Sequence, residues 1–358
     1  MDVQILHGSN PYDIRAWDDL VSQAPRPDVY YRPGYVRACA SAGEGRPVAV
    51  VVRGGSTEAL FPFLVRQFEI DGVPIRDAIT PYGYGGLLRL SGPEHPDLQV
   101  ARDVFCQLRD WACASGLVGC TIRFHPLLRQ DGSWGVAEMA EGWARIFLRG
   151  RTTALQLQHW DVVHCRLRGM SKGRRRDLTR ARLASNLRIS QGPSAVDDLN
   201  IFRALYRESM ERVDADRFFF YTDEYYEHLA KGLGENFAVF TALTDDRPVA
   251  AAIFLADRDF VHYHLAANNE EGRRGGAATL LVVAAAEWAW RRGCSMLHLG
   301  GGLKSDDSLW AFKSSFGGTI FSYSYMTLVA NIEQYGYLTQ HPAASWPYAH
   351  APQMAGSD

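Results

Sequence analysis

The stretch that decides the fold is VAVVVRGGSTEALFPFLV, residues 48–65, because the chain carries a counterpart about 190 residues later. In this stretch an apolar run rich in valine is followed by a turn containing glycine and serine and then by a second apolar run, which is typical of an antiparallel hairpin. The counterpart is FAVFTALTDDRPVAAAIFL, residues 237–255, with its turn at Thr244-Asp-Asp-Arg-Pro248. Two hairpins of one layout predict a chain built from two copies of one unit.

The sequence around the two hairpins repeats as well. Tyr31-Arg-Pro-Gly-Tyr35 precedes the first hairpin, and Tyr221-Thr-Asp-Glu-Tyr225 precedes the second. Further along, one apolar segment ends at Gly116 and another at Gly293, and each is followed by a short apolar run. Glycine just after a helix suits a left-handed C-cap, and the run that follows indicates a buried strand. Each half therefore predicts a helix, a hairpin, a long helix and a further strand.

This order of elements fits a mixed α/β fold of the GNAT type, in which a splayed mixed sheet receives an acyl donor. We expect two tandem GNAT-like domains with a cleft between them. We expect residues 1–155 to form the first domain, completed by C-terminal strands 319–340, and residues 156–318 to form the second, which carries a basic segment at 166–188. Residues 341–358 are rich in proline, alanine and serine and predict a loose tail.

Composition excludes several classes of protein. The chain has 358 residues, more than one hydrophobic core usually supports, and its 47% hydrophobic and 22% charged residues are typical of ordinary globular domains. A formal net charge of -2 means that any contact with nucleic acid requires a local basic patch, and we expect no DNA partner.

Cysteine spacing and the apolar runs indicate the compartment. The six cysteines form no CxxC pair and no cluster with zinc spacing, which predicts reduced thiols and no metal site. The sequence begins without a secretory leader pattern, and its longest apolar run, 277–286, is about half of what a bilayer span needs. We therefore expect a cytoplasmic protein without a membrane span.

The basic segment between Arg166 and Arg188 carries nine arginines and lysines against one acid, Asp177. One interpretation is a solvated helix face whose charge is neutralised elsewhere in the fold. The other is a phosphate-binding surface, because arginine forks bind phosphate oxygens in a bidentate way. The candidate phosphate ligands are Lys172, Arg174, Arg175, Arg176 and Arg180.

The segment from Arg273 to Ala278 matches the pattern R-x-x-G-x-A, through Arg273, Gly276 and Ala278. In GNAT enzymes this pattern holds the pyrophosphate of coenzyme A on a helix N-terminus, where backbone N–H groups point at the anion. An ordinary helix start explains the same residues.

The stretch SDDSLWAFKSSFGG, residues 305–318, predicts a short helix that is capped by Ser305 or Asp306 and ends at the glycine pair. Phe312 and Phe316 then share one apolar face, and Lys313 lies beside Phe312 near the C-terminal end. Lys313 is thus either a partner of the helix dipole or a functional cation.

Aromatic residues supply candidate ligand contacts in both halves. The loop Pro81-Tyr-Gly-Tyr-Gly-Gly86 presents Tyr82 and Tyr84, or is only a tight connection. In the second half, the strand pattern His262-Tyr-His264 places the two histidines on one face and Tyr263 on the other. Two histidines without a third ligand indicate a cleft or core feature, so no metal is assigned.

The two GNAT-like units, the loop 81–86, the basic run 170–177 and the element Phe312-Lys313-x-x-Phe316-Gly317-Gly318 together resemble the FemABX family. Members of this family are nonribosomal peptidyl transferases, which join an amino acid from aminoacyl-tRNA to an amine. The likeness extends over nearly the whole chain, and the Phe-Lys-x-x-Phe-Gly-Gly element is its most specific part.

The resemblance implies an aminoacyl-tRNA co-substrate, no bound cofactor, and an acceptor that is a small peptide, a peptidyl-nucleoside or a carrier-bound amine in antibiotic or cell-wall peptide biosynthesis. It makes Lys313 the leading catalytic candidate, with Phe312 as its aromatic wall, and it assigns the basic run to tRNA phosphates. The acceptor is expected to contact Tyr82, Tyr84, Tyr221, Tyr225 and Tyr263.

Two departures from the family bear on the acceptor: the first speaks against a nucleotide-linked muropeptide, and the second gives no support to a lipid-linked acceptor. Tyr221 stands four positions before Tyr225, where members that bind a nucleotide-linked muropeptide have a basic residue. The charged coiled-coil arm of some cross-bridge enzymes is missing.

Two alternative functions stay open: an acyl-CoA-dependent GNAT N-acyltransferase, and a binding protein with GNAT architecture and no activity.

Overall fold

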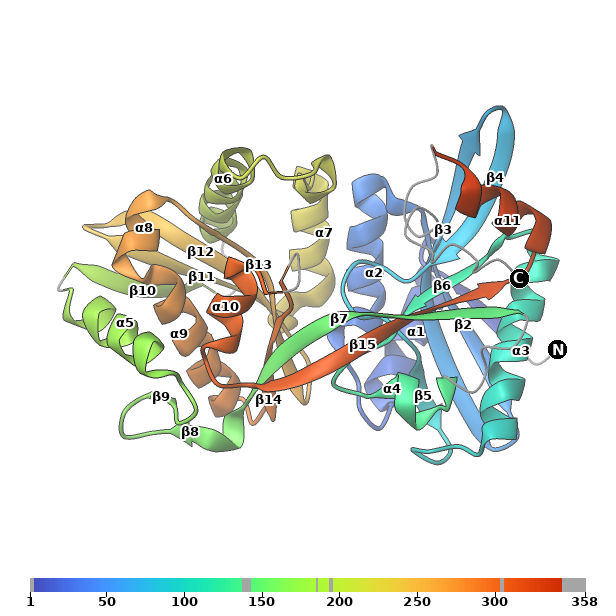
Figure 1. The fold of residues 1–358 in the computed structure, drawn as a ribbon, viewed down its shortest axis with the longest axis horizontal. Helices are drawn as coiled ribbons and strands as arrows, with labels where there is room; N and C mark the ends of the chain where they lie inside the picture. The colour runs from blue at the N-terminus through green and yellow to red at the C-terminus, as the bar shows by residue number, and fades with distance from the viewer. Residues whose placement is uncertain (1–2, 137–142, 185, 193–195, 303–305, 343–358) are drawn as a thin grey trace, which may run out of the picture. The chain divides into compact units, whose positions relative to one another are not determined.

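The structure is a computed structural model that describes residues 3–136, 143–184, 186–192, 196–302 and 306–342. The expected loose tail therefore lies almost wholly outside the described residues. The chain divides into two compact units, of which the first comprises residues 1–149 and 322–358 and the second residues 150–321. The sequence-based boundary after residue 155 falls inside a strand, β7 (Ala144–Gln156), that passes from the first unit into the second (Figure 1).

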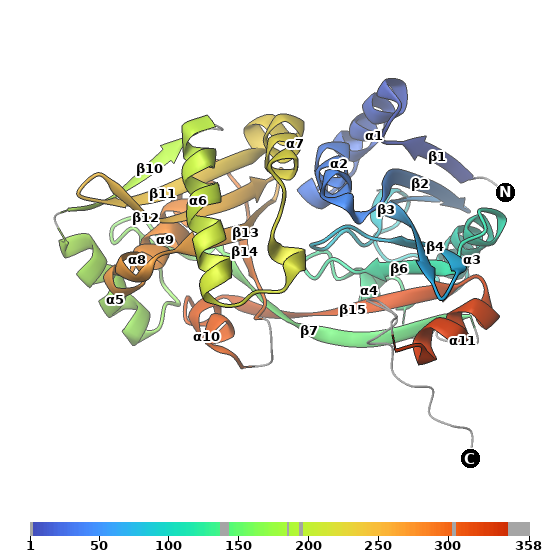
Figure 2. The same ribbon diagram turned by 90° about the horizontal axis from the view of Figure 1, so that it is seen from above.

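The first unit contains a sheet with the strand order β1-β2-β3-β4-β6-β15-β7, and β5 pairs with β3. Its strands are β1 (Val3–His7), β2 (Arg46–Gly54), β3 (Thr57–Ile70), β4 (Val73–Ile79), β5 (Leu88–Ser91), β6 (Gly119–Arg123) and β15 (Thr319–Val329). Its helices are α1 (Pro11–Gln23), α2 (Pro33–Cys39), α3 (Leu98–Ala114), α4 (Gln130–Ser133) and α11 (Ile332–Gln340). Figure 2 shows α1 and α2 on one side of this sheet and α3 on the other.

The second unit contains a sheet with the order β7-β14-β13-β12-β11-β10 and a small ribbon, β8-β9. Its strands are β8 (Trp160–Asp161), β9 (Arg166–Leu167), β10 (Leu187–Gly192), β11 (Phe237–Thr244), β12 (Arg247–Ala256), β13 (Phe260–Asn268) and β14 (Met296–Gly300). Its helices are α5 (Lys172–Leu183), α6 (Val196–Arg212), α7 (Asp223–Leu233), α8 (Glu270–Gly275), α9 (Ala277–Arg291) and α10 (Ser308–Ser314).

The internal repeat is confirmed by the structure. In the first unit α2 leads into the antiparallel hairpin β2-β3, and in the second unit α7 leads into β11-β12. Each long helix, α3 or α9, is followed two residues after its end by a glycine with positive φ, Gly116 at 64° or Gly293 at 79°, and then by a strand. The fold is a mixed α/β fold with two GNAT-like units, as the hairpins predict.

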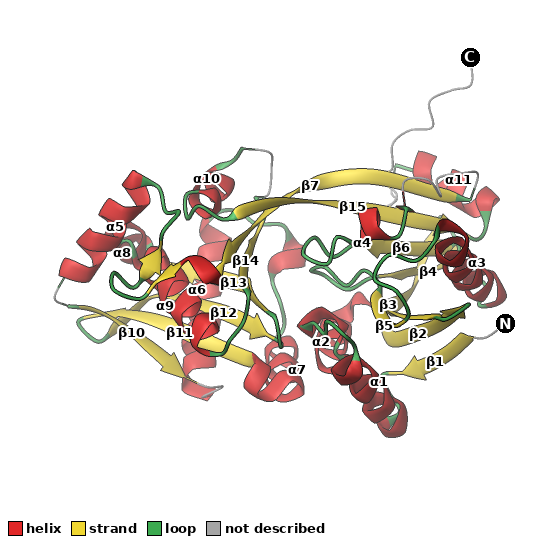
Figure 3. Ribbon diagram, turned by 90° about the horizontal axis from the view of Figure 1, so that it is seen from below, coloured by secondary structure: helices red, strands yellow, loops and turns green. Residues whose placement is uncertain are grey.

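Of the C-terminal strands expected over 319–340, the structure forms one, β15, over Thr319–Val329, whereas Ile332–Gln340 form the helix α11. Strand β15 pairs antiparallel with β6, from Tyr325 opposite Arg123 to Val329 opposite Gly119. Its other neighbour is β7, and Figure 3 shows these two strands running side by side over most of their length. Because β7 leads out of the first unit and β15 leads back into it, the second unit is an insertion in the first.

The second unit buries its main core between the sheet and α9. Alanines and valines of α9 pack on Phe240, Ala252 and Phe254, all of which are at most 1% exposed. The apolar run at 277–286 is thus a buried helix, which suits its nearly continuous hydrophobicity. The opposite face of the sheet is covered by α6, which Figure 2 shows lying across β11 and β12. Among the described residues no helix combines the length and the apolar composition of a bilayer span.

Two glycines bring the segment after α10 against the segment before α5. Gly317 has a φ of 78°, and a side-chain carbon there would collide with the carbonyl oxygen of Gly169. A carbon on Gly169 would in turn lie 2.9 Å from the carbonyl oxygen of Gly317. The backbone contact requires glycine at both positions, and at Gly317 the left-handed conformation also requires it.

Gly317→Ala is expected to lower the free energy of unfolding by at least about 2 kcal/mol, because it combines a backbone collision with an unfavourable positive φ. Gly173→Ala is the matched control, since Gly173 lies in α5 with open space around it and alanine favours the helix. Urea denaturation of the two variants measures the difference. Equal stability of both would show that the contact between Gly169 and Gly317 contributes nothing.

Candidate active site

The candidate catalytic residue Lys313 lies in α10, a helix of seven residues. The N-cap is Asp307, whose carboxylate accepts a 2.6 Å hydrogen bond from the backbone N–H of Trp310. The expected caps were one or two residues too early: Asp306 has a φ of 62° outside the helix, and Ser305 is outside the described residues. Helical structure ends at Ser314, and Gly317 then turns the chain toward β15.

The ammonium group of Lys313 points into the protein. The residue is only 9% exposed, and Nζ donates a 2.8 Å hydrogen bond to the carbonyl oxygen of Gly301, just after β14. Nζ also lies 5.8 Å from the centre of the Tyr263 ring, within the range of a cation–π contact. An ammonium group has three N–H donors, and the carbonyl of Gly301 uses one of them.

The electrostatic environment of Lys313 is unusual for a lysine. Burial lowers the pKa of Lys313 from 10.5 to about 8, although the carboxylate of Asp307 acts in the opposite direction. Among the described residues no carboxylate lies within ion-pair distance of Nζ. Lys313 is therefore a cation in a desolvated position whose charge is not consumed by a salt bridge, and such groups are candidates for a functional site.

Phe312 is placed differently from the expectation. The ring beside the Lys313 ammonium is Tyr263, whereas Phe312 contacts Phe316 edge to face at 5.2 Å and lies under the guanidinium of Arg174. Phe316 is fully buried and belongs to the core beneath α9. Phe312 thus links α10 to Arg174 and to the core instead of forming a wall for Lys313.

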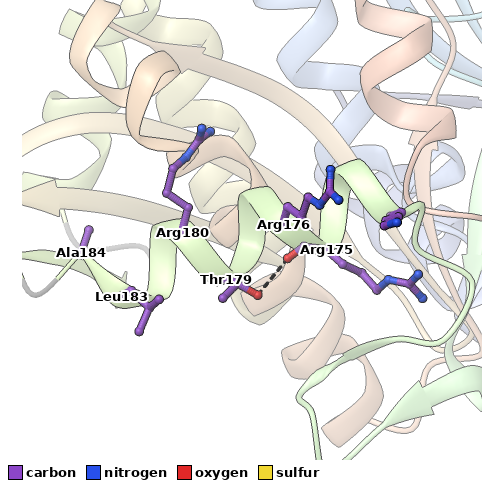
Figure 4. A pocket seen from close by; sticks show the side chains of 7 residues that line it. Arg175, Arg176, Thr179, Arg180, Leu183 and Ala184 are labelled. Atoms are coloured by element: carbon purple, nitrogen blue, oxygen red, sulfur yellow. Dashed lines mark hydrogen bonds between the residues drawn. The ribbon is translucent and has the colours of Figure 1, made fainter.

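The basic run forms α5, and its arginines divide between two faces. Arg174 turns inward, with a side chain that is 16% exposed. Lys172, Arg175, Arg176 and Arg180 line a shallow surface depression of about 780 Å³ together with Thr179, Leu183 and Ala184. Figure 4 shows the side chains of Arg175, Arg176 and Arg180 extending from the helix into solvent.

The inward position of Arg174 corrects its assignment to the phosphate-binding surface, and the sequence contained a signal for it. Leu178 and Ala181 are buried and follow Arg174 at intervals of four and seven residues. This spacing places all three on one helix face. Counting charge along the segment without applying the helical period put Arg174 with its exposed neighbours.

The pattern R-x-x-G-x-A lies at the break between two helices. Arg273 is exposed near the end of α8, Gly276 is the left-handed link with a φ of 77°, and α9 begins at Ala277. A side-chain carbon on Gly276 would lie 3.5 Å from Ala181 Cβ and 3.6 Å from the carbonyl oxygen of Asp177. Ala278 follows in the first turn of α9, so α5 packs directly against the link that the pattern marks.

The tyrosines of the second unit separate into two groups. Tyr225 is fully buried, stacks on Tyr221 with ring centres 4.2 Å apart, and has its hydroxyl oxygen 2.7 Å from Nε2 of His264. Burial, with a smaller effect from His262, lowers the pKa of His264 to about 3, so this imidazole is neutral at physiological pH. Tyr263 instead belongs to the α9 side of the sheet, with Lys313.

Strand β13 carries both Tyr263, which packs on the α9 side of the sheet, and His264, which is bonded to Tyr225. Its pairing with β12 shifts register between Ile253 and Phe254, which leaves His264 as an extra residue between Tyr263 and Leu265. Such a bulge re-aims side chains at sheet positions. His262, on the same strand, lies with its Nδ1 3.2 Å from Nδ1 of His298 on β14, and both histidines are 1% exposed.

The tyrosines of the first unit surround an arginine that the sequence analysis missed. The guanidinium of Arg123, at the end of β6, lies 5.8 Å from the ring centre of Tyr82, 5.9 Å from that of Tyr84 and 4.9 Å from that of Tyr325. It donates a 2.9 Å hydrogen bond to the carbonyl oxygen of Gly83 in the glycine-rich loop. Burial raises the pKa of both loop tyrosines, so their hydroxyls remain protonated. No sequence motif marks Arg123, because its partners come from distant segments.

Comparison with known proteins agrees with this architecture. Residues 166–313 match the family model described as an acetyltransferase (GNAT) domain. The crystal structure of FemX is similar over 90% of this chain and 98% of that one, with 12% identity and a TM-score of 0.68. L-PGS from Bacillus licheniformis is similar over 91% of this chain and 93% of that one, with 13% identity and a TM-score of 0.54.

A tandem GNAT protein from the clavulanic acid biosynthesis pathway, solved without AcCoA, is similar over 92% of this chain and 99% of that one, with 12% identity and a TM-score of 0.51. No curated protein sequence matches this chain. The fold thus belongs to the class of tandem GNAT proteins. Within that class the chain has a FemABX-like fold, and the match to the GNAT domain model lies in its second unit.

Lys313→Met is expected to leave the protein at least as stable as the wild type at pH 7, with a gain of up to roughly 3 kcal/mol if the desolvation of the cation is fully relieved. The unfolded chain keeps the lysine proton up to about pH 10.5, whereas the folded chain releases it near pH 8. The free energy of unfolding of the wild type should therefore rise with pH between these values, and that of Lys313→Met should not.

Urea denaturation at several pH values between 7 and about 10.5 measures both curves. Lys231→Met is the control, because Lys231 lies exposed on α7 and its loss should leave the slope with pH unchanged. Equal slopes for the wild type and Lys313→Met would show that Lys313 has an ordinary pKa.

Proposed function

We propose that this protein is an aminoacyltransferase that takes an amino acid from aminoacyl-tRNA and forms an amide bond with the amine of a small peptide, peptidyl-nucleoside or carrier-bound acceptor. The observation that carries the proposal is the buried ammonium of Lys313, which has no carboxylate partner among the described residues and lies in the element most specific to the FemABX resemblance. The FemABX-like fold and the GNAT domain support it.

The reaction converts an ester to an amide. The acceptor amine attacks the carbonyl carbon of the aminoacyl ester, an oxyanion forms on that carbonyl oxygen, and the bond to the ribose oxygen then breaks. The proton lost by the amine ends on the ribose hydroxyl. The ester is already activated, so the protein mainly positions the amine and stabilises charge, and no covalent enzyme intermediate is needed.

Lys313 supplies the positive charge for the oxyanion and the leaving ribose oxygen. Its hydrogen bond to Gly301 fixes the direction of Nζ, and the remaining N–H groups serve as donors. A preorganised cation in a desolvated site is more effective than one in water because solvent does not screen it. With a pKa near 8 the group is largely protonated at neutral pH and is also acidic enough to protonate a leaving alkoxide.

The outer face of α5 is the proposed surface for tRNA phosphates. Four cations line its depression, and Asp177, the acid of this segment, is engaged by Arg174 at 3.3 Å and Arg180 at 3.1 Å. A local positive surface on a chain of net charge -2 suits a polyanion that is bound through its backbone. The depression is open and shallow, as expected for a nucleic-acid surface and unlike a small-molecule pocket.

In the second unit the acceptor is proposed to contact Tyr221, while Tyr82 and Tyr84 of the first unit stay candidates that the family resemblance implies. Tyrosine side chains combine an apolar ring with a hydrogen-bonding hydroxyl group, which suits a peptide or nucleoside. Tyr225 is buried beneath Tyr221 and bonded to His264, so it supports Tyr221 and does not itself contact the acceptor.

The proposal includes a cytoplasmic location, because charged tRNA is found in the cytoplasm.

An acyl-CoA N-acyltransferase is the second candidate, favoured by the match to the acetyltransferase domain model. The local geometry favours tRNA instead. The start of α9, where a GNAT enzyme would hold pyrophosphate, is packed against α5, and Arg174 donates a 2.9 Å hydrogen bond to Thr279 Oγ1 in the first helical turn. An anion at this position would have to displace those contacts.

The decisive experiment offers the protein a pool of radiolabelled aminoacyl-tRNA with amine acceptors. Transfer that is abolished by ribonuclease, and unaffected by acetyl-CoA, is the expected result. Lys313→Met should lower kcat about a hundredfold or more, the loss typical of removing one preorganised charge donor, while its folding stays intact. Label transfer from acetyl-CoA without any tRNA would select the second candidate. Near-normal kcat in Lys313→Met would reject the role of this lysine.

Arg175→Gln and Arg176→Gln are expected to raise KM for aminoacyl-tRNA several-fold and to weaken its dependence on salt by about one unit of log–log slope for each lost phosphate contact, with kcat little changed. Arg207→Gln is the control, since Arg207 is exposed on α6 at the opposite face of the sheet. Filter-binding titrations at four salt concentrations measure the slopes. The same slope in all variants would remove α5 from the tRNA surface.

A further inference from the structure

The position of Lys313 depends on contacts that α10 makes with other elements. A helix of seven residues is far below the length at which an isolated helix is stable in water. Its first turn is held by the Asp307 cap and by Trp310, which lies under the guanidinium of Arg151 at 4.9 Å. Its second turn, which contains Lys313, needs a separate anchor.

That anchor is the inward arginine of α5. The guanidinium of Arg174 lies 4.6 Å from the ring centre of Phe312 and 5.2 Å from that of Phe316. Its Nε donates a 2.9 Å hydrogen bond to Ser315 Oγ, and Ser315 Oγ in turn donates to the carbonyl oxygen of Phe312 at 2.6 Å. The side chain thus contacts three residues around the end of α10, namely Phe312, Ser315 and Phe316.

The backbone adds a second connection at the same place. The N–H of Ser171, the N-cap of α5, donates a 2.9 Å hydrogen bond to the carbonyl oxygen of Ser315. This bond satisfies a carbonyl group at the end of α10 and fixes the distance between the start of α5 and the end of α10. Arg174 stands one turn further along α5, where its side chain crosses from one helix to the other.

Only arginine provides this set of contacts. A planar guanidinium stacks on aromatic rings and donates in several directions at once, as Arg174 does to Ser315, Thr279 and Asp177. A lysine ammonium keeps the charge but cannot stack in a plane or span Ser315 and Thr279 together. Burial lowers the pKa of Arg174, against the opposing effect of Asp177, so placing this cation inside has a free-energy cost that a purely structural apolar residue would avoid.

We infer that Arg174 is a positioning residue: it fixes the second turn of α10 against α5 and α9 and thereby sets the direction of the Lys313 ammonium. This inference rests on the proposed role of Lys313. It separates adjacent residues of one basic run by task, since Arg174 organises the site while Arg175 and Arg176 face the tRNA surface.

Hydrogen–deuterium exchange of the full-length protein tests the anchor without any substrate. In Arg174→Gln, peptides covering residues 306–317 should exchange about tenfold faster than in the wild type, because the opening of α10 becomes easier. In Arg175→Gln the same peptides should exchange as in the wild type. Ser315→Ala, which removes a single hydroxyl partner, should shift exchange in the same direction by a smaller factor and serves if Arg174→Gln folds poorly.

Steady-state kinetics separates positioning from binding. Arg174→Gln should lower kcat at least about tenfold and keep KM for aminoacyl-tRNA within about twofold, whereas Arg175→Gln should raise KM and keep kcat. Arg174→Lys should restore little of the lost kcat, since charge alone does not recreate the stacked contact. The double variant Arg174→Gln with Ser315→Ala should be less impaired than the product of the two single losses.

The outcomes distinguish the inference from the proposed function. Unchanged exchange of residues 306–317 in folded Arg174→Gln overturns the anchor, whatever the reaction is. Faster exchange together with an unchanged kcat leaves Arg174 with a structural role only and also overturns the inference. Faster exchange in a protein that shows no RNase-sensitive transfer keeps the anchor and rejects the aminoacyl-tRNA reaction instead.

Discussion

The second unit is organised around a cation held away from water with a carbonyl and an aromatic ring as its partners. Keeping the Lys313 ammonium in such surroundings is unfavourable, and a carboxylate beside it would be the simplest remedy. The structure uses Gly301 and Tyr263 instead, so the charge stays available to a ligand. The apolar core beneath α9, which includes the buried ring of Phe316, adjoins the helix that carries Lys313.

Arginines in this unit show how burial and charge divide along one helix. On α5, Arg174 is stacked and hydrogen-bonded in the interior, whereas the next residue, Arg175, lines the surface depression. Arg174 of α5 hydrogen-bonds to Thr279 of α9 and to Ser315 at the end of α10. The exposed arginines form a positive surface whose charge is only partly balanced by Asp177. One side of the helix therefore presents positive charge to solvent, while the other side contacts the end of α10.

Much of the fold follows from the sequence. The paired hairpins at 48–65 and 237–255 predicted the two units because alternating turns and apolar runs are local signals. The sequence predicted the short helix α10 but placed its cap too early. Asp306 and Asp307 carry the same side chain, and only the backbone geometry shows that Asp307 accepts the hydrogen bond from Trp310.

The site was only partly accessible from the sequence. Lys313 could be selected by resemblance to a family motif, and its burial without an acid could not be foreseen. Arg123 was missed because its aromatic surroundings come from loop 81–86 and β15, which are more than 200 residues apart. Alternation along the strand correctly placed Tyr263 on the other face from His264, which is bonded to Tyr225, whereas the register shift at His264 could not be foreseen.

Because the second unit is inserted between β7 and β15, the order of synthesis constrains how the first unit is completed. Residues 1–149 are synthesised long before β15. The edge of β6 that pairs with β15 therefore stays open while some 170 further residues are made. An open strand edge invites pairing with other chains. If the inserted unit folds early, the returning strand reaches that edge soon after it is translated. Early folding of the inserted unit would thus shorten the time during which the nascent chain can pair with other chains.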